Sequence, residues 1–210
     1  MKRFVTAAIA LSLSILLAAP LAAAEIKILA FGDSLVHGYG LPAADTFPAQ
    51  LETRLKASDP EVSVINAGNS GDTTAAGRAR LDWALAESPD AVIVVLGAND
   101  GLRGLEPSQT YANLDAILGE LEGRGLPVLL AGMLAPRNLG SAYVEEFDGV
   151  FQRLAAEYPV VFYPFFLDGV ATVPELNQPD GNHPTAAGVA EIVERLLPAA
   201  QELVRQSRGG

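Results

Sequence analysis

The stretch IKILAFGDSL, residues 26–35, carries the pattern that decides the fold: an apolar run of strand length, 26–31, leads at once into a polar, glycine-bearing turn. Four further apolar runs of strand length follow along the chain, at 62–67, 91–96, 127–133 and 159–163. All five runs are continuous rather than alternating in polarity, which is typical of strands covered on both faces. The sequence therefore predicts five buried strands.

Helical spacing fills the intervals between these runs. Apolar residues recur every three or four positions in five segments, at 47–57, 74–87, 107–124, 141–158 and 185–206. Strands that alternate with helices favour a parallel sheet with helices on each side, so we expect a doubly wound α/β fold. No internal repeat, low-complexity tract or linker is visible, and one domain over 25–210 accounts for the pattern.

Composition excludes several classes of protein. The 210 residues are 50% hydrophobic, with no cysteine and two histidines, so a disulfide framework, a thiolate zinc site, an iron–sulfur cluster and a cysteine nucleophile are ruled out. We expect neither a metal nor a cofactor. The net charge of −11 opposes binding to nucleic acid and to anionic membranes, because both need a basic surface.

Residues 1–24 resemble a secretory signal peptide. Lys2 and Arg3 give a positive start, an apolar stretch follows over 4–19, and Ala22-Ala23-Ala24 offers a small-residue cleavage site before Glu25. The apolar stretch falls short of the ~20 residues that span a bilayer. We therefore expect cleavage, no stable membrane anchor, an exported protein that is periplasmic or secreted, and a mature net charge of −13.

Polar, glycine-bearing clusters follow the predicted strands, at 32–35, 66–74 and 97–101, and a fourth precedes the last helix at 180–184. In open α/β sheets, ligands bind outside the carboxyl ends of the strands. The four clusters are therefore expected to meet at one edge of the sheet and to form one site.

Ser34 lies at a strand-to-helix turn, which suits a nucleophile, and a serine nucleophile needs a histidine base. His183 is the better of the two histidines, because Asp180 precedes it by three residues and can accept its Nδ1 proton while Nε2 faces Ser34. We expect Ser34, His183 and Asp180 to be the nucleophile, the general base and the residue that orients the base. Helix capping is the alternative role for Asp180. His37 has no such carboxylate and is interpreted as a pocket-rim or structural residue.

Acyl transfer also needs hydrogen-bond donors for the developing oxyanion. Three candidates follow three different strands: the backbone amides of Ser34 and Gly71, and the side-chain amide of Asn99. A tight turn at Gly71 and an ordinary turn role for Asn99 are the alternatives, and the convergence of the clusters favours the oxyanion hole.

These residues resemble the four sequence blocks of the SGNH (GDSL) hydrolase family. The blocks are Gly-Asp-Ser-Leu at 32–35, Asn-Ser-Gly-Asp-Thr at 69–73, Gly-Ala-Asn-Asp at 97–100 and Asp-Gly-Asn-His-Pro at 180–184, and segments 99–105 and 134–140 are similar to the arylesterase and thioesterase/lysophospholipase branch. The resemblance implies a flavodoxin-like three-layer α/β/α sandwich with a five-stranded parallel sheet. It also implies metal-free serine catalysis, with Ser34, Gly71, Asn99 and His183 as the four name residues and Asp180 as the triad acid.

Two residues depart from the pattern of that family, Asn69 and Asn182, where an aliphatic residue is usual. Each places an amide beside the expected site. Asn69 is expected to alter the oxyanion loop or the polarity of the pocket, and Asn182 to compete for hydrogen bonds with Asp180 or His183.

We therefore predict a serine esterase that acts on a small-molecule carboxylic ester through an acyl-enzyme. Its negative charge favours neutral aryl or short-to-medium acyl esters over anionic coenzyme A thioesters, with thioesters and lysophospholipids as further substrates. Either an acyl pocket or buried packing explains four leucines after the third and fourth strands, Leu102, Leu105, Leu134 and Leu139.

Two alternatives stay open. One is an O-acetyl esterase of cell-envelope polysaccharide or peptidoglycan, although Trp83 is the single tryptophan and no sugar-stacking platform is visible. The other is a non-catalytic carbohydrate- or lipid-binding module. The sequence does not specify the oligomeric state.

Overall fold

The apolar runs form a central parallel sheet. The computed structural model describes residues 25–209, and its five strands are ordered β2-β1-β3-β4-β5, all parallel. The strands are β1 (Ile26–Gly32), β2 (Val62–Gly68), β3 (Ala91–Val95), β4 (Val128–Ala131) and β5 (Val161–Tyr163). Every residue of β3 is buried, as its continuous apolar run predicts.

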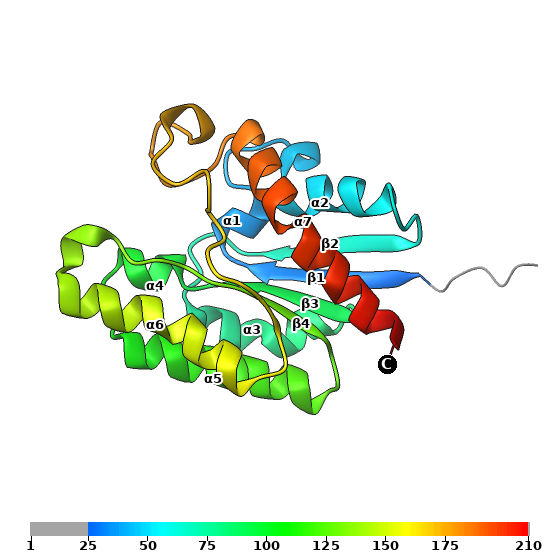
Figure 1. Ribbon diagram of the computed structural model, residues 1–210, viewed down its shortest axis with the longest axis horizontal. Coiled ribbons are helices and arrows are strands. Elements are labelled where there is room, and N and C mark those ends of the chain that lie inside the picture. Colours follow the sequence, from blue (N-terminus) through cyan, green and yellow to red (C-terminus); the bar gives the residue numbers. More distant parts are fainter. Residues whose placement is uncertain (1–24, 210) are drawn as a thin grey trace, which may run out of the picture.

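Helices cover both faces of the sheet (Figure 1). One face carries α1 (Ser34–His37), α2 (Phe47–Lys56) and α7 (Ala186–Gly209), and the other carries α3 (Thr74–Leu85), α5 (Pro107–Gly123) and α6 (Ser141–Glu157). The short helix α4 (Ala98–Leu102) follows β3. The predicted three-layer flavodoxin-like fold is confirmed, because this strand order is the flavodoxin-like one.

The strand order also places the site. The chain runs from β1 outward to β2 and then back across to β3, so the carboxyl ends of β1 and β3 lie side by side, with Gly32 paired to Val95. Gly68, at the end of β2, pairs with Gly32 from the other side. The loops that follow these three strands therefore open at the switch point of the sheet, where ligands bind in this fold class.

The structure corrects two predicted strands. The fourth and fifth strands are shorter than 127–133 and 159–163, because both predicted runs start at a proline, which has no N–H for the sheet ladder. The ladder ends at Gly132: its amide still donates to the carbonyl of Tyr163 in β5, but its carbonyl accepts from the amide of Phe166, beyond that strand. The α1 and α4 helices were not predicted, since four or five residues are too few to show a helical period.

No helix within residues 25–209 is long and apolar enough to cross a membrane. The predicted signal peptide, 1–24, lies outside the described residues.

Candidate active site

Ser34 is the first residue of α1, directly after β1. The preceding carboxylate, Asp33, is fully buried and caps this helix by accepting the amide N–H of Leu35 at 3.0 Å. Gly32 makes the sharp turn sterically possible, because a Cβ at this position would collide with the side chain of Val36 and the carbonyl oxygen of Val95. The strand, the turn and the cap together present the Ser34 hydroxyl at the edge of the sheet.

The structure brings Ser34, His183 and Asp180 together. The Nε2 of His183 lies 2.9 Å from the Oγ of Ser34, and its Nδ1 lies 2.7 Å from an Oδ of Asp180. The other carboxylate oxygen of Asp180 accepts the amide N–H groups of Asn182 and His183, at 2.9 and 3.1 Å. Asp180 therefore shapes the loop that carries the histidine. It does not cap α7, which begins at Ala186.

Hydrogen bonds keep Asp180 ionised. The ring of His183 and then the amide of Asn182 lower the pKa of Asp180 to about 2. At any pH near neutrality the ionised carboxylate holds the proton of the imidazole on Nδ1, so Nε2 is left as the acceptor that faces Ser34.

Neighbouring side chains fix the imidazole of His183. The ring of Tyr39 covers it, with the two ring centroids 4.6 Å apart and the planes tilted by 36°. Gln178 ties the two loops together: its backbone amide donates to the carbonyl of His183, and its side-chain amide donates to the carbonyls of Tyr39 and Pro184. Neither Tyr39 nor Gln178 was predicted, since nothing in their sequence spacing marks them.

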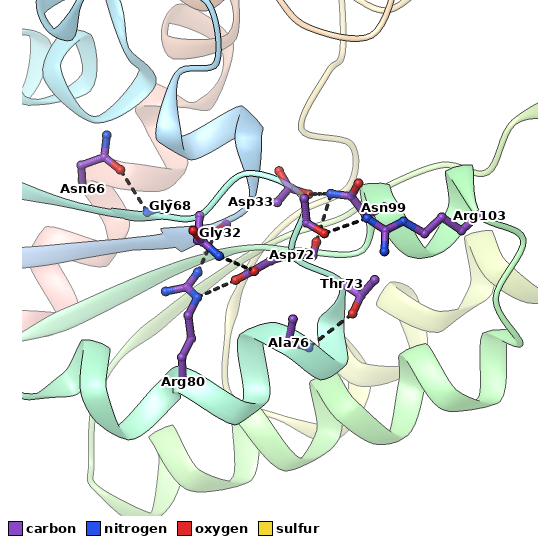
Figure 2. A network of polar contacts seen from close by, with 12 residues as sticks. Gly32, Asp33, Asn66, Gly68, Asp72, Thr73, Ala76, Arg80, Asn99 and Arg103 are labelled. Atoms are coloured by element: carbon purple, nitrogen blue, oxygen red, sulfur yellow. Dashed lines mark hydrogen bonds and ion pairs between the residues drawn. The ribbon is translucent and has the colours of Figure 1, made fainter.

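Three candidate oxyanion donors come from three loops: the amide of Ser34 at the start of α1, the amide of Gly71 after β2, and the side chain of Asn99 in α4. Among the described residues, neither backbone amide has a hydrogen-bond acceptor, which leaves both available to a ligand. The Nδ2 of Asn99 is held by two acceptors, the carboxylate of Asp33 at 3.2 Å and the carbonyl of Asp72 at 3.0 Å (Figure 2).

Gly71 has a backbone conformation that favours glycine, with φ at +87°. The space around it is open, because a Cβ would meet nothing nearer than the Nη2 of Arg103 at 3.9 Å. That same guanidinium donates to the carbonyl of Gly71 at 2.9 Å and so fixes the peptide. The constraint at Gly71 is therefore conformational rather than steric.

Replacing Gly71 with alanine should strain the loop and shift its amide, which lowers kcat by about tenfold or more and stability by about 1–2 kcal/mol. Gly125→Ala is the matched control, since Gly125 also has a positive φ, of +70°, and open space, but lies before β4 at the opposite end of the sheet. Steady-state kinetics and urea denaturation of both variants test this. An equal loss of kcat in both would contradict a role of the Gly71 amide in the site.

Burial raises the pKa of Asp33 to about 6, against hydrogen bonds from Leu35 and Asn99 that lower it. Between pH ~4 and ~6 the folded protein therefore holds a proton that the unfolded chain has released, so this group's contribution to stability is lost as the pH rises through that window. The expected change is about 3 kcal/mol. Urea denaturation of the wild type and of Asp33→Asn at pH 4 and 6.5 measures the free energy of unfolding of each. Between these two pH values the wild type should lose this amount of stability relative to the variant. If the difference in unfolding free energy between the two proteins is the same at both pH values, the raised pKa of Asp33 is contradicted.

A largely apolar cavity of about 570 Å³ opens beside Ser34 and His183. Leu102 and Leu134 line it, whereas Leu105 and Leu139 do not, so of the two alternatives the acyl pocket applies only to Leu102 and Leu134. The rest of its apolar wall was not predicted, because the sequence does not show which side chains in the segments after β1, β3, β4 and β5 face the cavity: Leu35, Ala98, Met133, Ala135, Pro136, Phe165, Leu167 and Ala171.

Two other predicted positions lie apart from this cavity. His37 is exposed and is not among its lining residues; its backbone carbonyl accepts the side-chain amide of Asn66, a contact that any residue supplies. Trp83 is 75% exposed on α3 and also lies outside the cavity.

The two unusual asparagines differ in what they contact. Asn69 donates from Nδ2 to the carboxylate of Asp72 at 2.6 Å, so its side chain contacts the loop that carries Gly71. Asn182 contacts the triad through its backbone amide, which any residue supplies, and among the described residues its side chain makes no hydrogen bond to Asp180 or His183. Within residues 25–209, no group of three or more histidine, aspartate and glutamate side chains is arranged to hold a metal ion.

The flavodoxin-like α/β fold and the Ser34–His183–Asp180 geometry together define a serine hydrolase. The chain belongs to the GDSL-like lipase/acylhydrolase family, whose model matches residues 30–190. It is a carboxylic ester hydrolase of SGNH type, as the sequence blocks predicted.

Named relatives agree with this assignment. An arylesterase of Vibrio mimicus is 39% identical over 183 residues, which cover 87% of this chain and 90% of the relative. Thioesterase 1/protease 1/lysophospholipase L1 of Escherichia coli K12 is 38% identical over 184 residues, 87% of each chain. The crystal structure of AlinE4, an SGNH-hydrolase family esterase, superimposes with a TM-score of 0.72 at 49% identity, covering 85% of this chain and 96% of that one.

Proposed function

We propose that this esterase hydrolyses neutral aryl and short-to-medium acyl esters through a covalent acyl-enzyme, with Ser34 as nucleophile, His183 as general base and Asp180 as the residue that orients the base. The observation that carries the proposal is the continuous chain of contacts from Asp180 through His183 to the Ser34 hydroxyl, at 2.7 and 2.9 Å, beside an apolar cavity.

In the first half of the reaction, Nε2 of His183 accepts the hydroxyl proton while Oγ of Ser34 bonds to the ester carbonyl carbon. Negative charge then develops on the carbonyl oxygen, and the free backbone amides of Ser34 and Gly71 donate hydrogen bonds to it. Asn99 adds a third hydrogen bond by turning one N–H to the oxyanion from the longer of its two contacts, the one to Asp33 at 3.2 Å, while the other N–H stays on the carbonyl of Asp72. As the tetrahedral intermediate collapses, the ester C–O bond breaks and the leaving oxygen takes the proton from His183. The acyl group stays on Ser34.

The second half repeats these steps with water. His183 removes a proton from a water molecule as its oxygen bonds to the acyl carbon, and the proton then passes to Oγ of Ser34 as the bond to the acyl group breaks. A carboxylic acid leaves, and the serine and the neutral imidazole are restored. Because Asp180 stays ionised, it stabilises the imidazolium in both halves.

The cavity supports an uncharged acyl or aryl group as the bound part of the substrate. Apolar side chains such as Leu102, Leu134 and Phe165 line it, and its volume of about 570 Å³ suits a small ligand. The acidic surface disfavours encounter with coenzyme A thioesters, which carry several negative charges. Thioesters and lysophospholipids are the second candidate substrates, because the Escherichia coli relative is named a thioesterase and lysophospholipase.

A panel of p-nitrophenyl esters of increasing chain length, with lysophospholipid and acyl-CoA, tests the proposal. We expect the highest kcat/KM on short-to-medium p-nitrophenyl esters, and an acyl-CoA rate that is slower at low salt and rises with salt because screening removes the repulsion. A faster acyl-CoA rate that is indifferent to salt would reverse the order of substrates. Failure of a fluorophosphonate to label the protein would count against an activated serine.

Export is part of the proposal. It depends on residues 1–24, and N-terminal sequencing of the mature protein checks it, with Glu25 as the expected first residue. The proposed partner is the small-molecule ester, with neither nucleic acid nor a stable membrane anchor.

A further inference from the structure

Asp72 connects two of the three candidate oxyanion donors. Its backbone directly follows Gly71, and its carbonyl oxygen accepts the Nδ2 of Asn99 at 3.0 Å. A displacement of Asp72 would therefore move the Gly71 amide and release the Asn99 side chain at the same time. The position of this one residue sets much of the geometry of the oxyanion hole.

The carboxylate of Asp72 is held at both oxygens and is almost inaccessible, with 6% of the residue exposed. Nε of Arg80 donates to one oxygen at 2.5 Å, and Nδ2 of Asn69 donates to the other at 2.6 Å. We call Arg80, Asp72 and Asn69 the Asp72 clamp. Asn69 is the residue that departs from the family pattern, and here it adds a contact that an aliphatic side chain does not make.

Arg80 extends the clamp to β1, the strand that precedes the nucleophile (Figure 2). Its Nη2 donates to the carbonyl of Gly32 at 2.8 Å, two residues before Ser34, and its guanidinium carbon lies 4.4 Å from the ring centroid of Phe31. Long side chains on a helix point back toward its N-terminus, which is how Arg80, in the second turn of α3, reaches the loop before that helix. One guanidinium therefore contacts both the oxyanion loop and the end of β1.

The charge of Arg80 is as relevant as its shape. Asp72 and Asp33 are both buried carboxylates beside the place where negative charge develops on the substrate. The cation of Arg80, whose side chain is 18% exposed, compensates Asp72. Without it, an unpaired buried carboxylate would oppose formation of the oxyanion.

We propose that Arg80 and Asn69 are positioning residues for catalysis: through Asp72 they hold the Gly71 amide and the Asn99 amide where the oxyanion forms. Neither residue lines the cavity, so they act on the transition state and leave substrate binding unchanged. This proposal rests on the esterase function proposed above. A clamp that served only the fold would instead change stability and leave kcat of the folded enzyme unaltered.

The experiment compares Arg80→Gln, Arg80→Lys and Asn69→Leu with the control Arg78→Gln, which makes the same charge change at an exposed position of the same helix. With p-nitrophenyl acetate as substrate, we expect kcat to fall about 10²-fold in Arg80→Gln and about threefold in Asn69→Leu. In Arg80→Lys we expect a fall of about tenfold, because lysine keeps the positive charge but lacks the planar guanidinium group. KM should stay within about twofold of the wild-type value in each variant. Arg78→Gln should match the wild type.

A second readout separates positioning from folding. Affinity for a phenylboronic acid, which forms a tetrahedral adduct on the serine, should fall by the same factor as kcat/KM, while thermal denaturation reports the folded fraction. Unchanged kcat in the folded variants, or a loss confined to KM, would overturn the proposal. If Arg80→Gln does not fold, the kcat, KM and boronic acid affinity of Arg80→Lys and Asn69→Leu test the proposal in its place. An inactive wild type would refute the esterase proposal itself, and with it this one.

Discussion

Replacing Ser34 with alanine should lower kcat on p-nitrophenyl acetate by about 10⁵-fold or more, to the residual rate that the oxyanion donors and binding alone supply. The hydroxyl of Ser34 is the atom that becomes bonded to the acyl group, and no other described serine, threonine or cysteine hydroxyl or thiol lies within hydrogen-bond distance of His183. Labelling by a fluorophosphonate should disappear in the same variant. Stopped assays at high enzyme concentration measure the residual rate.

Stability distinguishes this loss from unfolding. Among the described residues, the Oγ of Ser34 hydrogen-bonds only to Nε2 of His183, so its removal leaves the caps and turns of the site intact. Ser108→Ala, at an exposed position of α5, is the matched control and should keep the wild-type rate. A Ser34→Ala protein that retained most of the activity would exclude Ser34 as the nucleophile.

The sequence could predict these groups because the fold itself brings them together. Ser34, Gly71 and Asn99 each follow a strand closely, and parallel strands end at the same edge of their sheet. His183 lies far along the chain, yet the spacing of Asp180, His183 and Pro184 marked it without any knowledge of the contact. Local chemistry and one topological rule were sufficient for these residues.

Other parts of the site depend on side-chain direction, which a linear pattern does not contain. Arg80 reaches Asp72 because its side chain runs back along α3, and Tyr39 covers His183 where Gln178 hydrogen-bonds to both of their loops. The same limit explains the leucines: Leu102 and Leu134 line the cavity while Leu105 and Leu139 do not, although all four lie in the segments that follow β3 and β4. Residues that position others have no signature of their own, since their partners are set by packing.

Asp180→Asn should lower kcat by about 10³–10⁴-fold while KM changes little, because Asp180 does not line the cavity. The pKa of this group, about 2, means that the wild-type carboxylate is ionised throughout the working range and fixes the proton of His183 on Nδ1. An amide in its place presents an N–H toward Nδ1 and favours the other tautomer, in which Nε2 carries the proton and no longer accepts from Ser34. The side chain of Asp180 is 39% exposed, so water replaces part of the lost interaction, and we expect a loss of kcat nearer 10³-fold than 10⁴-fold.

The matched control is Asp168→Asn, which removes the same charge from an exposed ion pair with Arg195 and should leave kcat unchanged. Equal rates for wild type and Asp180→Asn would mean that the loop alone orients the imidazole, and that the third member of the triad is dispensable.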